Sequence, residues 1–76
     1  MNRARRKEID ALLAQLEQIK ERIEELASAE HDSFDNMPDS LQGGERGRGV
    51  EAAADKLDEA VESLGEALDN LGEAKE

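Results

Sequence analysis

The sequence predicts an all-α protein, an antiparallel two-helix coiled-coil hairpin that assembles into a homo-oligomeric helical bundle. Apolar residues recur at alternating intervals of three and four in the first part of the chain and again after residue 49, as they do along the contact row of a coiled-coil helix. A Gly-rich stretch with the only Pro separates the two segments. With 76 residues, no Cys and one aromatic residue, the chain needs good helix packing or self-association to be stable.

The first helix is expected over residues 3–32. Outside the apolar row it consists largely of Glu, Gln, Lys, Arg and Ala, which favour helix. Its basic start, "RARRK" (residues 3–7), could bind nucleic acid. We favour pairing with the acidic end of the second helix (residues 66–76), which an antiparallel hairpin brings nearby. The predicted contact row of this helix is Ile9, Leu12, Leu16, Ile19, Ile23 and Leu26.

The second helix is expected over residues 45–74. Its text repeats every seven residues, as "DKLDEAV", "ESLGEAL" and "DNLGEAK", which is typical of a coiled-coil strand. The composition alone places its start at Val50. The earlier start near Glu45, which absorbs Gly47 and Gly49 into the first turns and which we expect, is implied by the family resemblance of the loop described below. The predicted contact row is Val50, Ala54, Leu57, Val61, Leu64, Leu68 and Leu71.

The residues beside the second contact row are unusually small. Alanines recur every seven residues on one side and two glycines lie on the other. Because Gly inside a helix costs about 1 kcal/mol relative to Ala, we expect another backbone to approach closely there, although simple tolerance of Gly is the alternative. The wide apolar face favours a bundle of two hairpins. The expected oligomer face is Leu13, Ala53, Ala60, Gly65, Ala67 and Gly72.

The connection covers residues 33–44. Pro38 disfavours helical geometry at the preceding residue and fits the first turn of a following helix, so "PDSLQ" can form one helical turn. We expect Phe34, Met37 and Leu41 to form a hydrophobic lid over the end of the hairpin.

The string "FDNMPDSLQGGERG", followed by "EAAADKLDEAVESLGEALDNL", resembles a family of small phage and prophage helical-hairpin proteins of bacteria. The shared pattern is a loop of the form aromatic-Asp-Asn-apolar-Pro-acidic-Ser-Leu-Gln and then Glu-Arg-Gly, and the resemblance covers residues 30–72. It implies a helix start near Glu45 and a bacterial host cell, but no established activity. The family commonly has Ser before Glu-Arg-Gly, where this chain has Gly44, a weaker organiser of the turn.

No residue set indicates an enzyme, a metal site or a cofactor. His31 and Asp35 could share a helical face, but a metal ion needs more ligands. Ser33 and Ser40 lack a base and an orienting partner. The one candidate anion site is Arg46 and Arg48 beside a helix N-terminus, which could bind a phosphate or nucleotide when copies converge. The alternative is that both side chains are solvated or pair with nearby Glu.

The net charge of −10 makes direct DNA or RNA binding unfavourable, and no apolar run is long enough for a membrane span. We expect a cytoplasmic, non-enzymatic accessory protein that binds itself and, through its acidic helical surface, a basic host protein, with inhibition of a host defence or nucleic-acid-binding protein as one form. The alternatives are a nucleotide sponge that uses Arg46 and Arg48, and a purely structural coiled-coil spacer.

Overall fold

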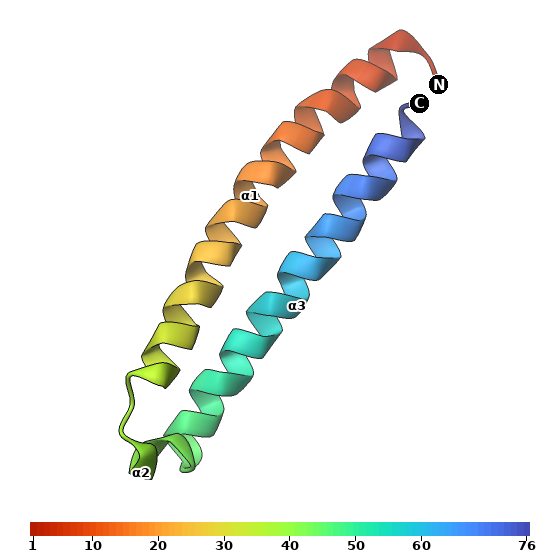
Figure 1. Ribbon diagram of the computed structural model, residues 1–76. Coiled ribbons are helices and arrows are strands. Elements are labelled where there is room, and N and C mark those ends of the chain that lie inside the picture. The colour runs from red at the N-terminus through yellow and green to blue at the C-terminus, as the bar shows by residue number, and fades with distance from the viewer.

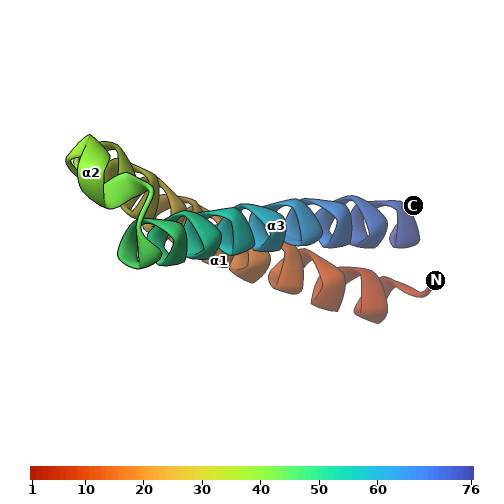
Figure 2. The ribbon, with the colours of Figure 1, turned by 90° about the horizontal axis from the view of Figure 1, so that it is seen from below.

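The computed structural model describes all 76 residues and contains three helices, α1 (Arg3–Asp35), α2 (Asp39–Gln42) and α3 (Glu45–Ala74), and no strand. The long helices α1 and α3 lie side by side in opposite directions, α2 closes one end, and the two termini meet at the other (Figure 1). The view along a perpendicular direction shows the same narrow rod (Figure 2), which measures 58 × 15 × 12 Å. The predicted all-α antiparallel hairpin is confirmed. None of the helices has an apolar stretch as long as a membrane crossing requires.

Both ends of α1 are defined by local hydrogen bonds. The Asn2 side chain caps the N-terminus, where its Oδ1 accepts from the Arg5 backbone N–H at 2.8 Å. At the C-terminus the Asn36 N–H donates to the Asp32 carbonyl at 2.9 Å. Because Pro38 disfavours helical geometry at the residue before it, the chain turns there. The helix therefore ends at Asp35, three residues beyond the expected end.

The start of α3 is held closely against α2. Helix α3 begins at Glu45, the earlier of the two starts that the sequence allowed, with Gly44 as its N-cap. Gly47 is buried, and a Cβ atom at this position would lie 2.5 Å from the Leu41 carbonyl oxygen. Only Gly fits without displacing the backbone of α2. This close approach, which the sequence did not reveal, sets how tightly the hairpin turns.

The contact row of α3 lies where the sequence places it. Ala54 is fully buried, and the row above and below it is half-buried against α1. Gly47 and Lys75 extend the same spacing to both ends of the helix. The half-buried members of the row are Val50, Leu57, Val61, Leu64, Leu68 and Leu71.

The contact row of α1 differs from the predicted one. Ile9, Leu16 and Ile23 face α3 as expected, but Leu12, Ile19 and Leu26 are 42, 46 and 58% exposed. Their places are taken by the next residues along the chain, which are Leu13, Lys20 and Ala27. Both sets flank the shared row Ile9, Leu16 and Ile23, one on each side, so the three-four spacing alone does not distinguish them.

Lys20 and Ala27 lie in the interface, and the residue opposite Lys20 is a glycine. The Lys20 Cε lies 4.0 Å from the position that a Cβ of Gly65 would take, so its aliphatic stem covers the gap left by the glycine. Ala27 is 5% exposed and sits in the half of the hairpin near the turn. Leu13, expected on the oligomer face, therefore lies in the hairpin interface instead.

Candidate interaction surfaces

One side of the hairpin carries a row of large apolar residues on one helix and a row of alanines on the other, and we call it the apolar side. On α1 it carries the large exposed residues Leu12, Ile19 and Leu26. On α3 it carries alanines at the same seven-residue spacing, half-buried or exposed in the hairpin, because they flank the contact row on that side. A hollow between the two columns is lined by Leu26, Ala29, Ala53 and Leu57 and by the charged residues Glu30 and Lys56. The alanines of the apolar side are Ala53, Ala60, Ala67 and Ala74.

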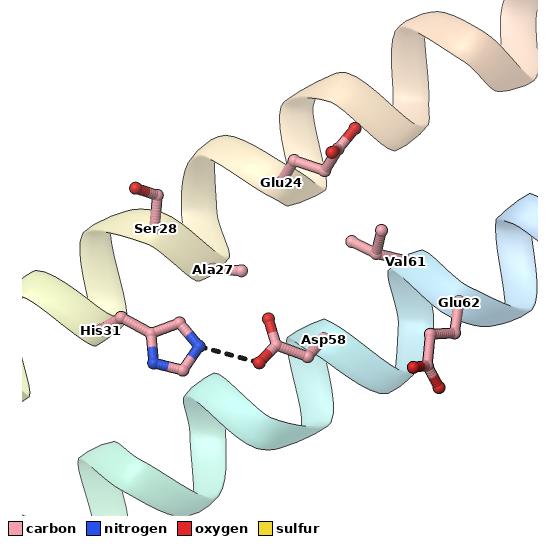
Figure 3. A pocket seen from close by; sticks show the side chains of 7 residues that line it. All are labelled: Glu24, Ala27, Ser28, His31, Asp58, Val61 and Glu62. Atoms are coloured by element: carbon pink, nitrogen blue, oxygen red, sulfur yellow. Dashed lines mark hydrogen bonds and ion pairs between the residues drawn. The ribbon is translucent and has the colours of Figure 1, made fainter.

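The opposite side, which we call the charged side, carries ionisable residues. It contains a shallow, open hollow in which His31 and Asp58 point toward one another from α1 and α3 (Figure 3). His31 Nε2 donates to Asp58 Oδ2 at 2.8 Å. The remaining lining residues are Glu24, Ala27, Ser28, Val61 and Glu62.

The pKa of His31 is shifted from its ordinary value. The hydrogen bond to Asp58 is the main cause that raises the pKa of His31 above 6.5, and the nearby carboxylates of Asp55 and Asp35 add to it. Ser28 lines the same hollow, but its hydroxyl points away from the His31 ring (Figure 3) and makes no hydrogen bond with it. No three His, Cys, Asp or Glu side chains in the protein are gathered as metal ligands. The His31–Asp58 hydrogen bond links α1 to α3, and we call such a contact a cross-helix tie.

The glycines of α3 lie on the charged side, and no other backbone approaches them. A Cβ at Gly65 would meet only the flexible end of Lys20, and one at Gly72 would meet nothing within 4 Å. The close backbone approach expected at both positions is therefore absent within the hairpin. Gly65 and Gly72 also face away from Ala53, Ala60 and Ala67, so these five residues do not form one face.

Most carboxylates of α3 have no cationic partner. Lys56 pairs with Glu59 at 3.0 Å, and Lys75 pairs across the helices with Asp10 at 2.6 Å. The other exposed carboxylates of α3 make no ion pair, which leaves an uncompensated acidic stripe along the helix. These residues are Glu45, Glu51, Asp55, Glu62, Glu66, Asp69 and Glu73.

The basic start of α1 also has no partner, contrary to expectation. Arg3, Arg5, Arg6 and Lys7 are exposed and form none of the ion pairs, including those expected with residues 66–76. The reason is the register of the two helices. Because Asp10 lies beside Lys75, residues 3–7 stand two or more residues beyond the level of the last residue of the chain.

The lid forms only in part, and a polar side chain completes it. Phe34 and Met37 are half-buried, but Leu41 is 49% exposed. The Gln42 side-chain amide instead donates to the carbonyls of Phe34 at 3.0 Å and Met37 at 3.3 Å. The bond to Met37 supplies a donor to a carbonyl just after the end of α1, and the bond to Phe34 adds a second donor to a carbonyl that also accepts from the Met37 N–H at 3.1 Å. This role of Gln42 could not be predicted from the sequence, because a polar residue in a turn is ordinary.

The two candidate anion ligands do not converge within one hairpin. Arg46 lines a hollow with Ser33, Met37 and Pro38 next to the turn, whereas Arg48 does not. They are two residues apart on α3, so their side chains leave the helix in nearly opposite directions. Neither makes an ion pair, including with Glu45 or Glu51.

Comparisons with protein families, with curated proteins and with solved structures found no match to this chain. These comparisons do not test the expected resemblance of residues 30–72 to phage hairpin proteins.

Proposed function

We propose that the protein acts without catalysing a reaction, as a self-associating interaction module that presents an acidic surface to a basic partner protein. The exposure of Leu12, Ile19 and Leu26 carries this proposal. Three large aliphatic side chains in one row on a soluble helix mark a contact with another chain, whereas exposed apolar residues scattered singly do not.

The size of the exposed surface supports self-association. A folded monomer of this mass exposes about 4,600 Å², whereas the hairpin exposes 5710 Å² for 8.4 kDa. Only Ile9, Ala27, Gly47 and Ala54 are buried. A single layer of two helices encloses no interior, and packing a second layer on the apolar side supplies one. A standard interface removes about 800 Å² from each partner, comparable with the excess.

Charge supports the second part of the proposal. When the apolar sides face one another, the uncompensated carboxylates of α3 point outward. Such a surface attracts a basic protein surface and repels nucleic acid, so it is suited to occupy a site where a host protein binds phosphate backbones. The phage-like loop indicates a bacterial cell as the setting, with a cytoplasmic protein of host defence as the partner.

Light scattering after size exclusion tests self-association. We expect a dimer or larger for the native chain, and a monomer for the Ile19→Gln, Leu26→Gln double variant, because Gln keeps the helix but removes the apolar contact. The matched control is Glu21→Gln with Glu25→Gln on the outer face of α1, which should leave the assembly unchanged. A native chain that is monomeric at high concentration contradicts the proposal.

Retention of host proteins from a bacterial lysate tests the acidic surface. The native chain should retain a basic protein at about 0.05 M salt and lose it at about 0.5 M, because screening weakens exposed charge pairs. A variant with Glu62, Glu66 and Glu73 changed to Gln should retain less at low salt. Equal retention by both chains would remove the support for an acidic binding surface.

A further inference from the structure

We propose that two copies pack their apolar sides together with both turns at the same end, so that the large residues of each copy lie against the alanines of the other. The inference rests on the proposed self-association and specifies its geometry. The partner is a second copy of this chain, and the two-fold axis runs parallel to the rod.

The register of the hairpin fixes which residues stand at the same level. Asp10 lies beside Lys75 and Lys20 beside Gly65, and the residue numbers of each pair add to 85. His31 and Asp58, nearer the turn, add to 89, which differs by about one helical turn and is within the reach of their side chains. In this register, each large residue of the apolar side on α1 is level, to within one residue, with an alanine of the same side on α3. The level pairs are Leu12 with Ala74, Ile19 with Ala67, and Leu26 with Ala60.

A two-fold axis along the rod keeps every residue at its own level and exchanges the two helices. It therefore lays α1 of each copy over α3 of the other, and Ile19 faces the partner's Ala67 while Ala67 faces the partner's Ile19. The column of large side chains fits the column of small ones along three heptads. Interfaces that alternate large and small residues in this way fill space without voids.

The opposite orientation, with the turns at opposite ends, fits less well. It places α1 on α1 and α3 on α3, so that large residues meet large ones and alanines meet alanines. The aliphatic row then holds the first pair of helices apart while the second pair needs a close approach. Gaps along the alanine column would forfeit dispersion contacts.

Charge complementarity supports a second copy as the occupant. Arg3, Arg5, Arg6 and Lys7 lack ion partners within the hairpin and lie at the open end. Because the two-fold axis keeps residue levels, the four basic residues lie just beyond the end of the partner's α3, and Lys7 stands two residues beyond the level of the partner's Glu76, which is exposed and unpaired. The hairpin thus carries both halves of an ionic contact with its own copy.

Distances between spin labels distinguish the orientations. A Cys at Gly43 is the only thiol in the chain, and a Cβ there meets nothing within 4 Å at a φ of −80°. Turns at the same end place the two labels less than about 30 Å apart, because neighbouring helix axes lie about 10 Å apart. Turns at opposite ends separate them by close to the 58 Å length of the rod.

Each outcome of the distance measurement either supports the proposed orientation or overturns it. A short distance supports the inference. A dimer with a long distance overturns the orientation and leaves the proposed self-association standing. A chain that stays monomeric overturns both. The circular dichroism of the labelled chain, compared with that of the native chain, shows that the helices are intact.

Mixing two size variants gives a second, independent test. Ala67→Leu places a large residue against the partner's Ile19 twice in its homodimer, so we expect its dimer to dissociate at least tenfold more readily than the native one. Mixed with an Ile19→Ala chain, it should form a heterodimer, because one contact then joins the new large residue with a new small one and the other is native. Failure of the mixture to associate, while each chain stays helical, would contradict the large-against-small packing.

Discussion

His31 Nε2 and Asp58 Oδ2 lie 2.8 Å apart, and their hydrogen bond links α1 to α3 in the half of the hairpin nearer the turn. The Lys75 and Asp10 side chains make the second cross-helix tie, at the open end. Both lie on the charged side, so electrostatic contacts align the helices there while the apolar side is free for another chain. The charged side therefore aligns the two helices of one hairpin, whereas the apolar side is free to contact another chain.

The His31–Asp58 bond makes stability depend on pH. Because the folded pKa of His31 is raised above 6.5, its contribution is fully present below about pH 6.5 and is lost as the pH rises through the raised pKa. We expect the native chain to exceed a His31→Gln variant in urea resistance at about pH 5.5, with the difference gone at about pH 8. Unfolding midpoints at equal protein concentration measure it, and the effect is small because the pair is exposed.

The control for this prediction removes the acceptor. Asp58→Asn keeps a side chain of the same size but takes away the main cause of the raised pKa. In that background, His31→Gln should change the pH profile much less. If the profile of the native chain is flat between pH 5.5 and pH 8, the tie contributes nothing and the prediction is wrong.

Gly47 should not tolerate a side chain, whereas Gly49 should. A Cβ at position 47 would lie 2.5 Å from the Leu41 carbonyl oxygen, while one at position 49 meets nothing within 4 Å. We expect Gly47→Ala to destabilise the hairpin by about 1–3 kcal/mol through forced backbone movement. Gly49→Ala should stabilise it by about 0.5–1 kcal/mol as a helix-interior Gly-to-Ala change. Urea unfolding followed by helicity measures both, and equal effects would contradict the close approach.

Gln42 should stabilise the end of α1 through its side-chain amide. Gln42→Ala removes the two bonds to the carbonyls of Phe34 and Met37 and should cost about 1 kcal/mol. Gln42→Glu keeps the shape but turns the donor into an acceptor that faces two carbonyl oxygens, so it should destabilise more than the alanine. Amide exchange at Asp35 and Asn36 should quicken in both variants, and a Glu variant as stable as the native chain would contradict the capping role.

The coiled-coil period predicted the fold because the three-four alternation of apolar residues has one simple solution, a pair of long packed helices. The same period did not determine which residues of α1 face α3. Leu12 and Leu13 are adjacent and both apolar, and the choice between them depends on how α1 is rotated against α3, which only the folded structure shows. That choice determines which residues are left for a second chain, so the candidate surface could not follow from α1 alone.

The turn also contains contacts that could not be predicted from the sequence. Pro38 predicted the end of α1 because its effect is local and acts on the residue before it. Gly47 and Gln42 act through backbone groups five or more residues away, which only the folded chain brings close. The pairing expected for Arg3 to Lys7 failed for a related reason, since relative helix lengths, and not charge alone, decide which ends meet.

The glycines of the charged side give a last test of which side joins the copies. Within one hairpin nothing restrains Gly72, and Gly65 touches only a flexible side chain, so Gly65→Ala with Gly72→Ala should stabilise the helices by about 1–2 kcal/mol in total. If the copies meet through the apolar side, the dimer should persist in this variant at its native affinity. If instead another backbone packs against the glycines, the new methyl groups would break the dimer while raising the helicity of the monomer. Sedimentation equilibrium together with circular dichroism separates these outcomes, because only the second combines lost association with a more helical chain.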